Sequence, residues 1–333
     1  MAVLVTGGAG YIGSIVTEEL FKDGYEVIVL DNLQKGHPEA VAPGILFVQA
    51  DLTNYQALEA VFSRYKIDTV MHMAAETEVE TSMVDPRKHY RDNVAAGLTL
   101  LEAMLSHDVK RIIFSSSAAI YGEPQSAIIE ETHSQIPINA YGETKLIFER
   151  TLGWYQRAYG LQYICLRYFN AAGASQLHGE DHRPETHLIP KVMKAILSGD
   201  NTVNVFGADY ATSDGSCIRD YVHVIDIARA HILAMMRLKD LSGKAFNLGS
   251  GEGYSVLEVT KAIERVCGQP LNIKICPRRY GDPARLVASS KRARELLEWK
   301  PQYSNLEEIA ASAWNWLRKH PQGYPEPAES HLN

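Results

Sequence analysis

A glycine-rich turn near the N-terminus constrains the fold of this chain more than any other feature. Gly7, Gly10 and Gly13 lie in the stretch GGAGYIG, directly after an apolar segment at residues 3–6 and before an amphipathic segment that begins near Tyr11. Glycine is needed where a strand turns sharply into a helix, where backbone approaches a pyrophosphate, and where the helix packs on the strand. The helix N-terminus then offers N–H groups to the phosphates. The pattern predicts a dinucleotide site, although a tight turn without a ligand has the same glycines.

An acidic residue at the end of the next predicted strand favours the dinucleotide interpretation. Asp31 ends the stretch EVIVLD, at about the 20-residue distance at which a carboxylate accepts hydrogen bonds from the adenosine ribose. The same carboxylate would repel a 2′-phosphate, and no arginine follows immediately to neutralise one, so NAD is predicted rather than NADP. Asp51 follows the third predicted strand and is expected to contact the adenine end, to cap the helix that starts near Asn54, or to do both.

Short apolar runs alternate with longer amphipathic stretches as far as Asn170, an order that is typical of a parallel sheet covered by helices. The longest predicted helices span residues 85–106 and 140–159. The fold class is therefore predicted to be α/β, with a Rossmann-type doubly wound parallel sheet and a smaller mixed α/β lobe that binds the substrate. The predicted strands, several of them rich in the valine and isoleucine that suit burial on both faces, span residues 3–6, 26–30, 45–48, 69–72, 111–115 and 162–168.

The composition of the sequence changes after Asn170, where a stretch rich in glycine, histidine, aspartate, serine and proline is predicted to form loops. The predicted division is an NAD-binding domain over residues 1–170 and a substrate-binding domain over residues 171–333. Two later segments, a predicted helix at residues 221–238 and a predicted strand at residues 245–249, are expected to return to the first sheet. The two domains are therefore expected to interleave.

Charge, hydropathy and cysteine spacing exclude several classes of function. The net charge of -7, without a long run of lysine or arginine, gives no footprint for binding nucleic acid. No apolar run reaches the roughly 18 residues needed to cross a bilayer, so no membrane role is predicted, and the N-terminal sequence lacks the features of a signal peptide, which predicts a cytoplasmic protein. The four cysteines are scattered, with no CxxC pair and no histidine at zinc spacing, so neither a metal site nor a disulfide is predicted.

Three residues have the types and spacing of a proton-transfer site. Tyr141 and Lys145 lie four residues apart at the start of a predicted helix, so their side chains project from one face. Tyrosine, with a pKa near ~10, is a poor base at neutral pH, but an ammonium group and a positively charged nicotinamide both stabilise its phenolate. Ser117, in FSSSAAIYG, lies at the C-terminal edge of the fifth predicted strand, where ligands bind to parallel sheets. An interfacial tyrosine beside a solvated lysine has the same spacing, but the position of this pair after the dinucleotide turn favours catalysis.

Over nearly its whole length the sequence resembles the extended short-chain dehydrogenase/reductase family, and within it the enzymes that invert carbon 4 of a UDP-linked hexose. The resemblance rests on GGAGYIG, FSSSAAIYG, YGETK, LRYFNAAGA, THLIP, CIRDYVHVID, RRYGDPARLVASS and HPQGYP. It implies that Ser117, Tyr141 and Lys145 are catalytic. The residues that it places around NAD are Gly7, Gly10, Tyr11, Ile12, Gly13, Asp31, Asn32, Asp51, Leu52, Ala74, Ala75, Asn93, Tyr141, Lys145 and Phe169. The residues that it places around the UDP-sugar are Ser117, Tyr141, Asn170, His187, Leu188, Val205, Phe206, Arg219, Arg279 and Asp282.

The resemblance further implies a homodimer, packed through the two long helices, that interconverts UDP-galactose and UDP-glucose through a 4-keto sugar with tightly bound NAD. The stretch HMAAETEVETSMVDP departs from the family pattern. Where that pattern has Gly-Glu-Ser this chain has Glu80, Thr81 and Ser82, and Thr77 stands where some relatives have a lysine near the cofactor. The resemblance therefore carries over no substrate contact from this loop.

Three other functions remain open from the sequence. Leu286 aligns with a residue beside the carbon 2 substituent that is a bulky tyrosine in some relatives, so an epimerase acting on UDP-N-acetylhexosamines is one alternative. A nucleotide-sugar 4,6-dehydratase is less favoured, because it needs an additional acid/base pair where this chain has Ala118 and Ala119, which exchange no proton. A non-catalytic NAD sensor is the alternative from another class, and the presence of Tyr141 and Lys145 argues against it.

Overall fold

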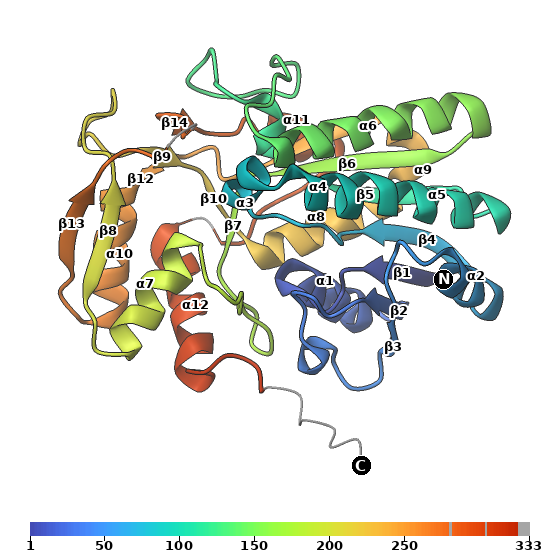
Figure 1. Cartoon of the computed structure of the whole chain (residues 1–333), viewed down its shortest axis with the longest axis horizontal. Coiled ribbons are helices and arrows are strands. Elements are labelled where there is room, and N and C mark those ends of the chain that lie inside the picture. Colours follow the sequence, from blue (N-terminus) through green and yellow to red (C-terminus); the bar gives the residue numbers. More distant parts are fainter. Residues whose placement is uncertain (280–281, 304, 326–333) are drawn as a thin grey trace.

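A seven-stranded sheet, all of whose strands are parallel, forms the centre of this computed structural model, which describes residues 1–279, 282–303 and 305–325. The strand order is β11-β6-β5-β4-β1-β2-β3 (Figure 1). All six strands predicted for the first part of the chain are present, with ends displaced by at most two residues. The bounds are β1 (Ala2–Thr6), β2 (Glu26–Asp31), β3 (Leu46–Gln49), β4 (Ile67–His72), β5 (Arg111–Ser117), β6 (Gln162–Tyr168) and β11 (Lys244–Leu248).

Helices cover both faces of this sheet, so that β1, near its centre, is buried along its whole length (Figure 1). Val3 and Val5 of β1 lie in a core with two helices, whereas Ala2 and Leu4 lie in a second core on the opposite face. Side chains of a strand alternate between faces, so β1 contributes to both cores. The first core is closed by α1 (Tyr11–Lys22) and α8 (Val224–Met236), and the second by α2 (Tyr55–Arg64), α5 (Ala96–Ser106) and α6 (Ala140–Tyr159).

The segment predicted as one long helix, residues 85–106, is divided into three parts, whereas the prediction for residues 140–159 is confirmed by α6. A short helix, α4 (Pro86–His89), leads into a π-helical stretch, η2 (Tyr90–Ala95), and α5 follows. The division coincides with a tertiary contact, because the Asn93 side chain in η2 binds the backbone of the loop after β4. Such π-helical turns are frequent at functional sites. A further helix, α3 (Val79–Val84), was not predicted.

The part of the chain after Phe169 that lies outside the large sheet forms a second region, with an apolar core of its own (Figure 1). Its helices α7 (Leu188–Leu197), α10 (Val256–Cys267) and α12 (Leu306–Lys319) pack together. Short strands form small sheets, in which β7 pairs with β10, β8 pairs with β13, and β9 lies between β12 and β14. The bounds are β7 (Asn170–Ala172), β8 (Thr202–Phe206), β9 (Ile218–Arg219), β12 (Tyr254–Ser255), β13 (Asn272–Cys276), β14 (Arg285–Leu286), α9 (Leu238–Leu241) and α11 (Lys291–Leu296).

Two segments from the second half of the chain join the first sheet. β11 pairs in parallel with β6, which confirms the predicted return of residues 245–249. The helix predicted over residues 221–238 is wrong at its start, because this segment begins with β10 (Tyr221–His223). The helix α8 then starts where Nδ1 of His223 accepts a hydrogen bond from the N–H of Ile225 at 3.1 Å. A histidine cap of this kind has no strong sequence preference, so the boundary was missed.

Part of the predicted substrate-binding domain, residues 171–333, lies outside the described residues, namely 280–281, 304 and 326–333. The first of these gaps falls within the motif RRYGDPARLVASS. Over the described part of the chain, no helix combines the length and the apolar character needed to span a membrane.

Candidate active site

The glycine-rich turn joins β1 to α1 through backbone contacts that exclude side chains. Gly7 has a φ of +73°, and a Cβ built on it would lie 2.6 Å from a backbone nitrogen in the loop after β4. A Cβ on Gly13 would lie 2.8 Å from the carbonyl carbon of Gly7. Gly10 precedes α1 without a side-chain cap, so the N-terminus of the helix is open to a ligand. Gly10, Tyr11 and Ile12, which were predicted around NAD, thus form the end of the turn and the start of the helix.

Asp31, Asn32 and Asp51 lie together where β2 and β3 end. The Asp31 carboxylate accepts hydrogen bonds from the N–H groups of Ala9 at 3.0 Å and Leu33 at 2.8 Å. Burial raises the pKa of Asp31, and these hydrogen bonds oppose the increase. The Asn32 amide donates to the Asp51 carboxylate at 2.8 Å. The structure therefore brings Asn32, predicted around NAD, together with the two carboxylates that were predicted at the adenosine end of the cofactor.

The expectation that Asp51 caps α2 is wrong, which leaves its predicted contact with the cofactor. Its carboxylate accepts a hydrogen bond from the N–H of Thr53 at 2.8 Å, whereas the cap of α2 is Asn54, whose Oδ1 accepts from a first-turn N–H at 3.2 Å. Burial alone would raise the pKa of Asp51, but the hydrogen bonds from Thr53 and Asn32 outweigh it, so the pKa is lowered. Leu52, beside it, is buried.

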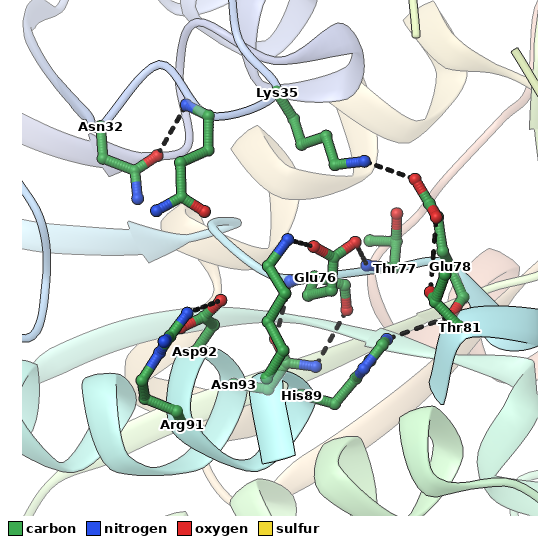
Figure 2. Close-up of polar contacts among 12 residues, drawn as sticks. Asn32, Lys35, Glu76, Thr77, Glu78, Thr81, His89, Arg91, Asp92 and Asn93 are labelled. Carbon is green, nitrogen blue, oxygen red and sulfur yellow. Dashed lines mark hydrogen bonds and ion pairs between the residues drawn. The ribbon is translucent and has the colours of Figure 1, made fainter. Parts of the chain in front are cut away.

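The loop after β4 is positioned by Asn93, as Figure 2 shows. Its Oδ1 accepts a hydrogen bond from the N–H of Glu76 at 2.7 Å, and its Nδ2 donates to the Glu76 carbonyl at 2.9 Å and to Thr144 Oγ1 at 3.0 Å. Because Thr144 belongs to α6, one buried side chain joins this loop to the helix of the predicted catalytic pair. Ala74 borders the glycine-rich turn, and Ala75 lies between it and Glu76 in the sequence. The sequence predicted Asn93 only as a cofactor contact and missed this supporting role.

Ser117 and Tyr141 meet where β5 ends and α6 begins. Ser117 is the last residue of β5 and caps a short 3-10 helix, η3 (Ala118–Tyr121), by accepting a hydrogen bond from the N–H of Ala119 at 3.1 Å. Tyr141 lies in the first turn of α6. The Ser117 hydroxyl interacts with the Tyr141 hydroxyl and lowers its pKa, but burial has the larger effect and raises it. The predicted pair of hydroxyl groups is therefore assembled, with the tyrosine in its neutral form.

Lys145 lies one helical turn from Tyr141 and is buried. Its Nζ donates a hydrogen bond to the carbonyl of Ser115 at 2.8 Å and lies 5.9 Å from the centre of the Tyr141 ring. Burial lowers the pKa of Lys145 to about 7, although the nearby Glu149 opposes the decrease. The site thus holds a proton donor and acceptor beside an amine that titrates near neutrality, an arrangement suited to general acid–base chemistry.

A buried hydrogen-bond network supports the strand end that carries these residues, and it was missed from the sequence. The Tyr168 hydroxyl lies 2.7 Å from Ser115 Oγ and 2.6 Å from Nε2 of His231 on α8. Burial lowers the pKa of His231 to about 4, so the imidazole is neutral at physiological pH. Because the Ser115 carbonyl binds Lys145, this network fixes the position of the Lys145 ammonium. Its residues come from three segments that are distant in the sequence, so no local sequence pattern predicts their contact.

The predicted substrate residues Asn170, His187 and Leu188 border one pocket of the second region. Nδ1 of His187 lies 2.6 Å from the carboxylate of Glu180, whose charge raises the pKa of His187 well above its usual value. Burial alone would raise the pKa of Glu180, but His187 and His182 together outweigh it and lower the pKa to about 2. Glu180, which the sequence did not single out, therefore holds His187 as an imidazolium at the pocket. Phe169 comes directly before Asn170 in the sequence and is buried in a small apolar cluster.

Arg219 and Asp282 form an ion pair in the structure. The Nη1 of Arg219 also donates to the carbonyls of Ile218 and Pro283, each at 2.8 Å. Two of the predicted substrate residues are thus in contact, with the guanidinium already bound to protein. Val205, on β8, was also predicted around the UDP-sugar. Its side chain lies in the apolar core with an exposure of 1%. Any contact between Val205 and a substrate is therefore limited to its backbone.

Arg279 and Phe206 are stacked, with the guanidinium carbon 4.1 Å from the centre of the ring. The Nε of Arg279 also lies 3.3 Å from Oε1 of Glu80, on α3. Glu80 is one of the residues that depart from the family pattern, and it reaches an arginine that was predicted beside the UDP-sugar. The carboxylate therefore occupies a place near Arg279 that suits an anionic ligand.

A group of four residues could supply ligands to a metal ion, although no metal site was predicted from the cysteines. Ligand atoms of Glu180, His182, Glu185 and His187 all lie within 4.8 Å of one another. In the structure these residues bind each other, with 3.1 Å between Nδ1 of His182 and the Glu180 carboxylate. Lys194 lies 3.7 Å from Glu185. The group therefore acts as a hydrogen-bonded cluster beside the pocket, and its composition also suits a divalent cation.

Comparison with known proteins agrees with this geometry. The sequence profile described as the NAD dependent epimerase/dehydratase family matches residues 3–249. The chain belongs to this family. It is 52% identical over 97% of its length to a UDP-glucose 4-epimerase of Halalkalibacterium halodurans, of which it covers 98%. A crystal structure of UDP-glucose 4-epimerase superposes with a TM-score of 0.95 at 46% identity, covering 98% of this chain and 100% of the other. The epimerase from Bifidobacterium longum in complex with NAD+ and UDP superposes with a TM-score of 0.92 at 38% identity, covering 97% and 100%. As a family member, the chain depends on NAD, and the glycine-rich turn and the residues Ser117, Tyr141 and Lys145 lie within the matched range.

Proposed function

We propose that this protein interconverts UDP-galactose and UDP-glucose by inverting carbon 4 of the hexose, with NAD as a tightly held cofactor. The observation that carries the proposal is the meeting of Ser117, Tyr141 and Lys145 at the sheet edge where the glycine-rich turn opens. The residues fit NAD, because Gly10 leaves the N-terminus of α1 without a side-chain cap, and a Cβ on Gly10 would meet only the Gly7 oxygen. Relatives that bear the name UDP-glucose 4-epimerase, including one bound to NAD+ and UDP, support the substrate.

In the proposed mechanism Tyr141 moves a proton at the sugar 4-hydroxyl. Bound NAD supplies a nicotinamide that accepts a hydride from carbon 4 and returns it. Tyr141 takes the hydroxyl proton as the C–H bond breaks, which leaves a 4-keto sugar, and gives the proton back after the opposite face of the sugar has been presented. Ser117 shares this proton through its contact with Tyr141. Lys145 stabilises the phenolate by its positive charge.

Inversion requires that the sugar turn while the UDP group stays fixed. Arg219 and Arg279 are the proposed diphosphate contacts, because guanidinium groups bind phosphate oxygens in pairs, and Phe206 is the proposed platform for the uracil ring. Arg279 is bound to Glu80 in the structure, so substrate binding would exchange a carboxylate for a phosphate. His187, held by Glu180 at the pocket, would add a positive charge on the substrate side.

One alternative differs only in the sugar that is accepted. Leu286, on β14, packs against the apolar cluster that contains Phe169 and Ala118. A leucine leaves more room than a tyrosine would, which favours acceptance of UDP-N-acetylhexosamines in addition to UDP-galactose. A dehydratase is less well supported, because Ala118 and Ala119 offer no acid beside Ser117.

Product analysis of the purified protein tests these proposals. Incubation with UDP-galactose, with and without added NAD, is expected to yield UDP-glucose. Tyr141→Phe is expected to lower kcat by about 10²–10⁴-fold, the usual contribution of a positioned acid or base. Leu286→Tyr is expected to abolish turnover of UDP-N-acetylgalactosamine and to spare that of UDP-galactose. A 4-keto-6-deoxy product would instead identify a dehydratase, and NAD binding without any turnover would identify a sensor.

Assembly, location and domain division are proposed as well. A homodimer packed through α5 and α6 is supported by large apolar side chains that are exposed on these helices, Leu98 at 39% and Trp154 at 66%. Sedimentation of Trp154→Glu should give a monomer where the wild type gives a dimer. We also propose a cytoplasmic location, and a division into residues 1–170 with 221–249 and residues 171–333.

A further inference from the structure

Two loops border the glycine-rich turn from opposite sides, because β1 lies between β4 and β2 in the sheet. The loop after β2 carries Lys35, and the loop after β4 carries Glu78. Figure 2 shows the Lys35 side chain reaching Glu78, with which it forms an ion pair. The two side chains are 35% and 23% exposed, so the contact is partly screened from water. The ion pair therefore passes over the sheet edge at which the turn after β1 lies.

The segment that carries Lys35 rests directly on this turn. The N–H of His37 donates a hydrogen bond to the carbonyl of Ala9 at 3.0 Å, and a Cβ on Gly36 would lie 3.0 Å from the same carbonyl. Ala9 is in turn bound through its N–H to Asp31 at 3.0 Å. The backbone on both sides of Lys35 is thus tied to the site proposed for the pyrophosphate.

The Glu78 side of the contact is also held in place (Figure 2). The carbonyl of Glu78 accepts a hydrogen bond from Thr81 Oγ1 at 2.9 Å and lies 3.0 Å from Nε2 of His89. Lys88 forms an ion pair with Glu76 in the same loop. Since Lys88 is engaged by Glu76, the Glu78 carboxylate is left to the lysine of the opposite loop.

We propose that Lys35 and Glu78 retain the cofactor, because their ion pair covers the pyrophosphate of NAD bound at the turn and slows its release. This inference rests on the NAD-dependent function proposed above. Inversion of one carbon returns the cofactor unchanged, so NAD need not leave between turnovers and a cover does not limit the rate. Lys35 also brings positive charge near the pyrophosphate, and Glu78 keeps the ammonium in that position.

The dissociation rate of NAD from the holoprotein tests the inference. An exposed or half-exposed ion pair contributes little, so Lys35→Ala and Glu78→Ala should each release NAD roughly two- to five-fold faster than the wild type. The double variant should release it no faster than the single variants, because both remove one interaction. Lys35→Glu combined with Glu78→Lys should retain NAD better than Lys35→Glu alone. The control is Lys291→Ala, which removes an exposed pair with Glu295 elsewhere and should change nothing.

Two readouts separate this inference from the proposed function. Bound NAD is measured as nucleotide freed by denaturing the purified protein, and its release is followed with a dehydrogenase that consumes free NAD. Faster release from the variants in a protein without epimerase activity would refute the function alone. Normal epimerase activity with unchanged release would refute the inference, as would a wild type that holds no NAD. If only Lys35→Ala releases NAD faster, Lys35 is a lone phosphate contact and the ion pair is no cover.

Discussion

Gly13→Ala and Gly10→Ala should impair different properties of the protein, although both glycines belong to one turn. A Cβ at Gly13 would lie 2.8 Å from the carbonyl carbon of Gly7 and 2.9 Å from Cα of Gly8, well inside the ~3.5–4.0 Å at which carbon atoms attract each other. Both neighbours are backbone, so no side chain can rotate away. A Cβ at Gly10 would meet only the Gly7 oxygen, at 3.4 Å, an ordinary contact. Gly13→Ala must therefore shift the turn, whereas Gly10→Ala fits the cofactor-free protein.

The magnitudes separate the two variants. Overpacking costs about 1–3 kcal/mol, and each kcal/mol lowers Tm by roughly 2–4 °C in domains somewhat smaller than this chain. Gly13→Ala should therefore melt several degrees lower in calorimetry without NAD. Gly10→Ala should melt within a few degrees of the wild type but bind NAD at least about tenfold more weakly, because the new methyl group faces the pyrophosphate. An unchanged Tm for Gly13→Ala, or wild-type NAD affinity for Gly10→Ala, would refute this reasoning.

Two further predictions concern ion pairs. Glu149→Ala should lower the free energy of unfolding by about 3–5 kcal/mol. The reason is that Arg167, bound to the Glu149 carboxylate at 3.0 and 2.6 Å, would stay buried without that carboxylate. Urea unfolding measures the loss, and the control Glu295→Ala, at an exposed residue, should cost less than about 1 kcal/mol. The Glu180–His187 pair should stabilise the fold most between about pH 4.5 and 6.5, the ordinary pKa values of the two groups. This contribution should vanish as pH rises through the raised pKa of His187 and as pH falls through about 2; a stability difference between wild type and Glu180→Gln that persists at high pH would contradict the assignment.

The first sheet was predictable because its determinants are local. Its strands are covered on both faces, so short apolar runs mark them, and turn glycines mark where β1 ends. The errors arose where a distant partner decides the structure. Residues 85–106 have the composition of one helix, but Asn93 binds the Glu76 backbone and divides it. Similarly, β10 forms because Tyr221–His223 finds β7, which no pattern within the segment reveals.

The candidate site shows the same difference between contacts set by local sequence and contacts set by distant partners. Ser117, Tyr141 and Lys145 were predictable because strand end and helix start bring them together within one βα unit. Several contacts that the sequence did not indicate join segments far apart in the chain, as Lys35 with Glu78 and Arg279 with Glu80 do. Residue types suggest which charges are available, but only the packing of the loops decides which carboxylate meets which cation. These pairs are therefore where the structure adds most to the proposed function.

The charge balance at Tyr141 links retention of the cofactor to the chemistry. Burial raises the pKa of Tyr141 and lowers that of Lys145 to about 7, and the two shifts have one cause, since burial disfavours either charged form. Burial therefore opposes the phenolate, and in the proposed mechanism the positive charge of oxidised nicotinamide would add to that of Lys145 in stabilising it. We expect Tyr141 to titrate at lower pH with NAD+ than with NADH, measured by the phenolate difference spectrum with Tyr141→Phe as the blank. If the two titrations coincide, Lys145 alone sets this pKa and retention of NAD serves hydride transfer only. If they differ, the cover formed by Lys35 and Glu78 also keeps the base active.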